Sequence, residues 1–216
     1  MLLHGLTLHA TSMKKLAKGL QDSGFRTCRV NYPSRDYPID TLVARFVLPK
    51  VKRCFPKDTV PLNFVTHSLG GIILRRMETM SGAPRIGRVV MIAPPNQGSE
   101  VVDSLKDWKL FAWWNGPAGR ELGTDSASEP RRLGVPRFEF GVIAATRSIE
   151  PWFSSLIPGR DDGKVAVEHT KLTGMRDFVE IPAPHMLVLW TDAAIVQSVS
   201  FLRTGKFEHP RKTDAD

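Results

Sequence analysis

The sequence predicts an α/β fold, in which a mostly parallel sheet of about six strands carries helices on both of its faces. Apolar runs typical of strands alternate along the chain with segments of helical periodicity, which is the order that βαβ units produce. The 216 residues are enough for one domain with a sizeable core. The composition, with 42% hydrophobic and 24% charged residues, argues against a disordered chain or a coiled coil.

The expected elements of the first part of the chain are a strand at residues 1–4, a helix at 12–22, a strand at 25–31, a helix at 41–54, a strand at 60–66, a helix at 69–80 and a strand at 88–93. Ser12 suits the N-cap of the first helix, and Gly24 follows its end. Asp40 can cap the second helix, which Pro49 should kink or break because proline lacks an amide hydrogen. The later elements are strands at 137–144 and 176–182 and a closing helix at 187–202.

Residues 96–135 interrupt this alternation, directly after the strand at 88–93. They contain three of the five tryptophans, which are Trp108, Trp113 and Trp114. Within them, residues 105–114 can form a short amphipathic helix. We therefore predict a single domain over residues 1–216, with an insertion at about 96–135 that caps one end of the sheet.

The chain carries 30 basic and 22 acidic residues, for a formal net charge of +8. The basic residues are scattered in short pairs, without a run of five or a basic helical stripe with interleaved aromatic residues. A nucleic-acid partner is therefore not predicted. Weak attraction to an anionic membrane surface or to an acidic substrate remains open.

Cys28 and Cys54 are the only cysteines, which is too few for a disulfide framework, and both are expected to be buried apolar side chains. Without a CxxC or His-x-x-His cluster, a structural zinc site is not expected. No apolar run approaches the ~20 residues of a membrane helix. The first residues also lack the pattern of a signal peptide, so we expect a cytoplasmic protein.

The predicted strand at 60–66 runs through the sequence Thr-His-Ser-Leu-Gly-Gly into a helix. A nucleophilic serine on a sharp strand-to-helix turn needs very small residues two positions away on either side, because the two backbones nearly touch there. Gly70 meets this need after Ser68, whereas Thr66 stands at the position before it. Ser68 is therefore a candidate nucleophile. The alternative is a serine that only caps the helix.

The first predicted strand ends in His4-Gly5-Leu6. Attack of a serine on a carbonyl produces an oxyanion that needs two hydrogen-bond donors. The amide of Leu69 can supply one at the start of a helix, and the amide of Leu6 can supply the other, because Gly5 permits an unusual backbone turn. We expect His4 to hold this loop through hydrogen bonds and His67 to be structural.

A general base and an acid that orients it should follow the serine in the order acid, then histidine. His185 lies between the last predicted strand and the closing helix, which makes it the candidate base. Asp161 and Asp162 both follow the strand at 137–144. We favour Asp162 because it directly precedes a glycine, and Asp161 remains the alternative.

Five motifs in this order, HGL, THSLGG, APPNQGSE, DDGKV and PAPHM, resemble those of the α/β-hydrolase superfamily, and more narrowly of compact bacterial esterases and lipases. The resemblance covers about residues 1–203. It implies an α/β-hydrolase fold, a triad of Ser68, Asp162 and His185, and the amides of Leu6 and Leu69 as the oxyanion hole. Thr66 departs from the family pattern, which has glycine there.

The function that these residues predict is that of a serine carboxylic-ester hydrolase, acting through an acyl-enzyme on short- to medium-chain esters or lipids. No metal or cofactor is required. Trp108, Phe111, Trp113 and Trp114 are expected to line the substrate pocket, or alternatively to pack on the sheet edge. Acyl transfer or thioester hydrolysis uses the same acyl-enzyme. A catalytically inactive hydrolase fold that binds a ligand is the alternative from another class.

Overall fold

The computed structural model describes residues 1–56, 60–105 and 107–209, without the side chains of residues 110–112. Within these residues, six strands form one sheet in the order β2-β1-β3-β4-β5-β6, and every neighbouring pair is parallel. The strands are β1 (Leu2–Leu3), β2 (Arg29–Val30), β3 (Leu62–His67), β4 (Ile86–Ile92), β5 (Phe140–Ala145) and β6 (Asp177–Ile181). The predicted fold class is confirmed.

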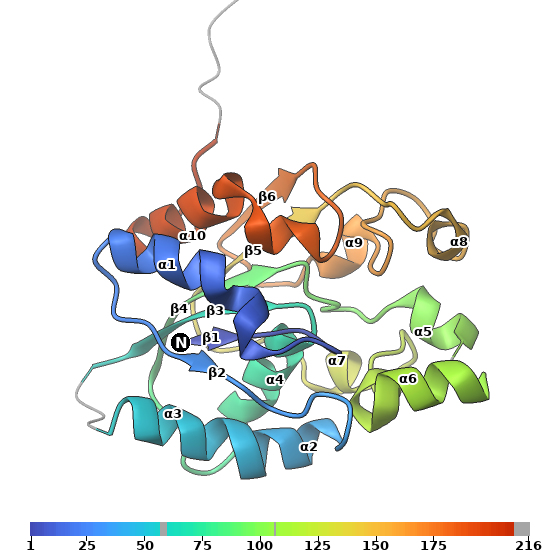
Figure 1. Cartoon of the computed structure of the whole chain (residues 1–216), viewed down its shortest axis with the longest axis horizontal. Helices are drawn as coiled ribbons and strands as arrows, with labels where there is room; N and C mark the ends of the chain where they lie inside the picture. The colour runs from blue at the N-terminus through green and yellow to red at the C-terminus, as the bar shows by residue number, and fades with distance from the viewer. Residues whose placement is uncertain (57–59, 106, 210–216) are drawn as a thin grey trace, which may run out of the picture.

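The helices in chain order are η1 (Ala10–Met13), α1 (Lys14–Asp22), α2 (Ile39–Leu42), η2 (Val43–Val47), α3 (Leu48–Cys54), α4 (Leu69–Glu78), α5 (Glu100–Leu105), α6 (Lys109–Arg120), α7 (Glu129–Arg132), α8 (Pro151–Ser154), α9 (Val167–Thr170), η3 (Leu187–Trp190) and α10 (Asp192–Thr204). Helices α1 and α10 cover one face of the sheet, and α2, α3 and α4 cover the other (Figure 1). In the described part of the chain, no helix is both long and apolar enough to span a membrane.

Alternate residues of each strand enter two separate cores. Leu3, Phe64 and Met91 belong to the core beneath α2, α3 and α4. Their neighbours Leu2 and Val65 belong to the core beneath α1 and α10. Both faces of the central strands are therefore buried, as a parallel sheet with helices on both sides requires.

Several predicted elements differ from the structure. The closing helix expected at 187–202 is divided into η3 and α10 at Thr191, whose backbone is extended. The strand expected at 25–31 shrinks to Arg29–Val30, because the Phe25 amide donates to Leu20 O (2.9 Å) at the end of α1. The helix expected to break at Pro49 continues, because the π-helical turn of η2 precedes α3 and leaves Pro49 in its first turn.

The insertion after β4 contains α5, α6 and α7. The helix expected at 105–114 is wrong, since α5 ends at Leu105 and α6 begins at Lys109. A small third core joins α5 to the segment around α8, through Leu105 and Ile157 among others. Helices α5, α6 and α8 thus lie together at one end of the molecule, on the right in Figure 1.

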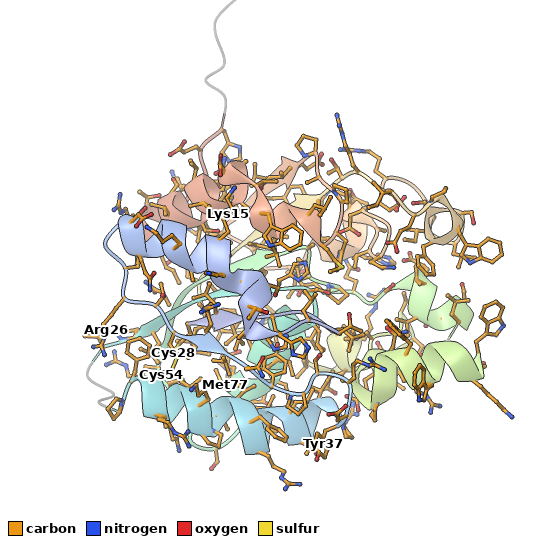
Figure 2. All side chains as sticks on the ribbon, in the orientation of Figure 1. Lys15, Arg26, Cys28, Tyr37, Cys54 and Met77 are labelled. Atoms are coloured by element: carbon orange, nitrogen blue, oxygen red, sulfur yellow. A yellow bond between two sulfur atoms is a disulfide. The ribbon has the colours of Figure 1, made fainter. Side chains whose placement is uncertain are left out.

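Cys28 and Cys54 form a disulfide, so the expectation of two free buried thiols is wrong. The bond joins the start of β2 to the end of α3, across 26 residues of chain, with the Cα atoms 6.3 Å apart. Figure 2 shows the two cysteines side by side, at the end of the molecule opposite α5, α6 and α8. The spacing of the two cysteines in the sequence does not predict this pair, because only the crossover from β2 to α3 brings them together.

Replacing both cysteines by alanine should lower the free energy of unfolding by about 3 kcal/mol, because the unfolded chain loses a closed loop of this length. For a domain of this size, the melting temperature should fall by about 6–12 °C. Thermal unfolding followed by circular dichroism measures the change. A reducing agent should lower the melting temperature of the wild type by a similar amount and leave the double variant unchanged. A wild type insensitive to reduction would contradict the prediction.

Candidate active site

Ser68 occupies a tight turn between the end of β3 and the start of α4. Its φ of 50° and ψ of −124° are unfavourable for a residue with a Cβ atom, so the surrounding structure holds it there. A Cβ atom at Gly70 would lie 2.6 Å from the carbonyl oxygen of Leu3, which explains the need for glycine. The first turn of α4 therefore packs tightly against the end of β1.

Thr66 fits at the position where the resembling family has glycine. Its side chain is fully buried, and its hydroxyl lies 3.5 Å from the carbonyl oxygen of Val90. A Cβ atom at Gly71 would lie 3.5 Å from Thr66 Oγ1. That distance is an ordinary van der Waals contact, and the turn at Ser68 forms with threonine at position 66.

The loop after β1 lies directly against Ser68. A Cβ atom at Gly5 would lie 3.1 Å from Cβ of Ser68 and 2.8 Å from Nδ1 of His67, so only glycine fits. Among the described residues, neither the Leu6 amide nor the Leu69 amide donates a hydrogen bond to the protein. Both amides are therefore available to an oxyanion, and the Leu69 amide also lies at the positive end of α4.

His4 and Tyr32 hold the loop after β1 in place through hydrogen bonds and ring stacking. Nδ1 of His4 lies 2.9 Å from the Gly5 carbonyl oxygen, and the Tyr32 amide donates to Nε2 of His4 at 3.3 Å. The Tyr32 hydroxyl donates to the His4 carbonyl oxygen, and the two rings stack with centroids 4.0 Å apart. Burial lowers the pKa of His4 to about 4, so the imidazole is neutral, with its proton on Nδ1 toward Gly5.

Asp162 and His185 are in direct contact. Nδ1 of His185 lies 2.7 Å from Oδ2 of Asp162, and both side chains are almost fully buried. Oδ1 of the same carboxylate accepts hydrogen bonds from the amides of Lys164 (3.0 Å) and Val165 (2.9 Å). In turn, the His185 amide donates to the Asp162 carbonyl oxygen at 3.1 Å. Asp162 therefore fixes both the loop and the ring of His185.

Asp161 has a different role. Its Oδ1 accepts hydrogen bonds from the Ser154 hydroxyl and the Gly163 amide, both at 2.7 Å. These contacts tie the aspartate loop to α8. The structure thus places Asp162, and not Asp161, against His185.

His67 connects the Ser68 turn to the loop of His185. Its Nε2 donates to the His185 carbonyl oxygen at 2.9 Å, and the two ring centroids are 5.0 Å apart. Burial lowers the pKa of His67 to about 3, with a further contribution from the neighbouring His185. A neutral His67 therefore holds the loops of Ser68, Gly5 and His185 together.

Arg75 belongs to one of the short basic pairs of the sequence, and its burial was not predicted. It lies in α4 and is only 2% exposed. Its guanidinium donates to the carbonyl oxygens of Pro130 (2.7 Å), Gly134 (2.8 Å) and Asn96 (3.1 Å). It therefore joins the loop after β4 to the end of the insertion. The only sequence signal was its place three residues after buried Ile72, on the inner face of the helix.

Arg75→Met should lower the free energy of unfolding by about 3 kcal/mol, because it leaves several buried carbonyl groups without a donor. The neighbouring Arg76→Met is the control. Arg76 is partly exposed and pairs with the exposed Asp40 and, at 3.7 Å, with Glu129, so its loss should cost less than that of Arg75. Urea unfolding measures both variants. Equal losses in the two would contradict the role assigned to Arg75.

The three tryptophans of the predicted pocket face solvent and do not form a closed roof. Trp108, Trp113 and Trp114 are 59%, 68% and 54% exposed, and the side chain of Phe111 lies outside the described residues. Helix α6 still reaches the site, because a Cβ atom at Gly119 would lie 2.9 Å from the Leu6 side chain. Their role in binding substrate stays a prediction. Among the described residues, no cluster of three or more His, Cys, Asp or Glu is arranged for a metal.

Comparison with known proteins gives a family and a fold. A model of the alpha/beta hydrolase family matches residues 1–211. No curated protein matches the sequence significantly. The mature lipase BlEst2 of Bacillus licheniformis superposes with a TM-score of 0.68 at 15% identity, covering 94% of this chain and 89% of that one.

Two further structures show the same fold. The metagenomic carboxyl esterase MGS0156 has a TM-score of 0.67 at 21% identity, covering 87% of this chain and 64% of its own. Phospholipase PlaB of Legionella pneumophila has a TM-score of 0.57 at 15% identity, covering 79% and 44%. At these identities the likeness concerns the fold alone.

Proposed function

The chain belongs to the alpha/beta hydrolase family, and from this premise we propose that it is a serine carboxylic-ester hydrolase. The observation that carries the proposal is the 2.7 Å contact between Asp162 and His185, on a loop that His67 ties to the turn of Ser68. Because all six strands are parallel, the loops after β1, β3, β5 and β6 meet at one edge of the sheet. That edge is where a nucleophile, a base and an acid from distant parts of the sequence can act together.

In the proposed mechanism, Nε2 of His185 accepts the proton of the Ser68 hydroxyl as Oγ attacks the ester carbonyl. Asp162 keeps the other imidazole proton on Nδ1 and stabilises the imidazolium cation that forms. The amides of Leu6 and Leu69 donate to the oxyanion of the tetrahedral intermediate. His185 then returns its proton to the leaving alcohol, and water hydrolyses the acyl-enzyme in the same way.

An ester is the substrate class that we propose, because the fold neighbours include proteins described as a lipase and a carboxyl esterase. The short to medium acyl length is the prediction made from the sequence. Acyl transfer and thioester hydrolysis proceed through the same acyl-enzyme and differ only in the acceptor or the leaving group. An inactive binding protein would need neither two free oxyanion amides nor an oriented imidazole.

Labelling with a fluorophosphonate probe tests the proposal, because only an activated serine reacts. We expect one label per chain, mapped to Ser68 by peptide mass, and none on Ser68→Ala or on heat-denatured wild type. A panel of aryl esters of increasing acyl length then separates ester hydrolysis from a merely reactive serine. An unlabelled, well-folded wild type would favour the inactive binding protein instead.

We also propose that the protein works in an oxidising compartment, rather than in the cytoplasm that the sequence predicts. The Cys28–Cys54 disulfide supports this, since such bonds persist outside the reducing cytosol. Alkylation of protein taken from its native cells, without prior reduction, should modify neither cysteine. Full alkylation of both cysteines would instead favour a cytoplasmic location.

A further inference from the structure

All five tryptophans of the chain lie on the surface. Their exposed fractions are 59% for Trp108, 68% for Trp113, 54% for Trp114, 66% for Trp152 and 47% for Trp190. Tryptophan is strongly buried on average in globular proteins, because its large ring gains most from leaving water. Both main cores of this protein are built from other residues. The exposed rings are therefore candidates for contact with a partner.

Four of the five rings lie on the two segments that connect β4 to β5 and β5 to β6. Trp108 precedes α6, Trp113 and Trp114 belong to it, and Trp152 belongs to α8. These four form what we call the tryptophan surface. The two segments begin where β4 and β5 end, at the same sheet edge as Ser68. The third core packs α5 of the first segment against residues around α8 of the second. Figure 1 shows α5, α6 and α8 together at that end of the molecule.

Positive charge accompanies these rings. The Arg35 guanidinium lies 5.7 Å from the centre of the Trp113 ring and 4.9 Å from that of Trp114. Lys109 in α6 and Arg147, after β5, are exposed, whereas Arg35 is half-buried. The exposed Asp107, next to Trp108, is an acidic residue in the same segment as Lys109. The whole chain carries a net charge of +8. A partner of the tryptophan surface should therefore be apolar in part and negatively charged at its surface.

We propose that the tryptophan surface docks on the headgroup layer of an anionic lipid membrane. Indole rings favour this layer because they combine an apolar body with a polar N–H group, and basic residues are attracted to its negative potential. A second copy of the chain fits less well, since two such surfaces would bring like charges together. Docking in this way turns the sheet edge that carries Ser68 toward the lipid.

Vesicle binding tests the proposal without relying on the proposed reaction, because it is measured on Ser68→Ala, which cannot alter the lipids. Neutral phosphatidylcholine vesicles are compared with vesicles that contain about one third phosphatidylglycerol. We expect co-sedimentation with the anionic vesicles at least about tenfold stronger than with the neutral ones, and weakened by salt. Tryptophan emission should shift to shorter wavelength on binding. Absence of binding to the anionic vesicles would overturn the proposal.

Tryptophan variants test whether the tryptophan surface is the part of the protein that contacts the vesicles. Trp113→Ala combined with Trp114→Ala, and separately Trp152→Ala, should each weaken anionic-vesicle binding at least about fivefold. Trp190→Ala is the matched control, because Trp190 is also exposed but lies on η3, where its Nε1 donates to Ser12 O at 3.3 Å. It should change binding less than about twofold. Equal losses from Trp190→Ala, or a lipid-free dimer abolished by the Trp113/Trp114 change, would overturn the assignment of this surface to lipid.

Discussion

Replacing Ser68 by alanine should lower the turnover of an aryl ester by about 10⁶-fold, because the proposed nucleophile of the acyl-enzyme is removed. The oxyanion amides of Leu6 and Leu69 belong to the backbone, so a small rate above that of water should remain. The melting temperature should stay close to that of the wild type, since the loss of one hydroxyl at a turn creates no large cavity. Steady-state kinetics and thermal unfolding on the same preparation measure both quantities.

A double variant sharpens this test. Residues that act as one unit are strongly non-additive, so Ser68→Ala/His185→Ala should be no slower than Ser68→Ala alone. If each change instead lowered the rate by an independent factor, Ser68 and His185 would act in separate steps. Unchanged turnover in a folded Ser68→Ala protein would exclude the mechanism altogether.

The second large effect is expected at Asp162, where Asp162→Asn should lower turnover by about 10⁴-fold. The amides of Lys164 and Val165 donate to Oδ1 of Asp162, so an asparagine there would keep its oxygen toward them. Its NH₂ group would then face Nδ1 of His185 and favour the wrong tautomer of the imidazole. Nε2 would carry the proton and could not accept one from Ser68.

Asp161→Asn is the matched control for this change. It alters the adjacent carboxylate, whose contacts are with Ser154 and Gly163 and not with His185. We expect its turnover within about tenfold of the wild type, because the tautomer of His185 is untouched. The opposite ranking of the two variants would move the orienting role to Asp161 and leave the rest of the mechanism as it stands.

The candidate site could be proposed from the sequence because its residues belong to short local motifs. The glycines beside Ser68 and the amides that follow Gly5 and Ser68 depend on the backbone of adjacent residues. The serine, aspartate and histidine follow β3, β5 and β6, and this order places them at one sheet edge when the strands are parallel. The strand and helix pattern predicted that arrangement without any distance between side chains.

The sequence was less informative about element ends and about the insertion. Strand β2 is short because the Phe25 amide bonds to α1, and α5 and α6 are separate where one helix over 105–114 was expected. Tyr32, which holds the oxyanion loop through His4, lies in a loop without a motif that marks it. These outcomes depend on contacts between residues far apart in the chain.

By itself, the sequence determined the α/β class, the parallel sheet with two helical layers, and the candidate triad, because alternating apolar patterns and short glycine motifs act over a few residues. Only the tertiary structure decided that Cys28 meets Cys54, that Arg75 is buried among carbonyl groups, and that the tryptophans face solvent. Each of these depends on which surfaces the crossovers bring together. A cysteine, an arginine or a tryptophan looks the same in sequence whether its neighbours in space are protein or water.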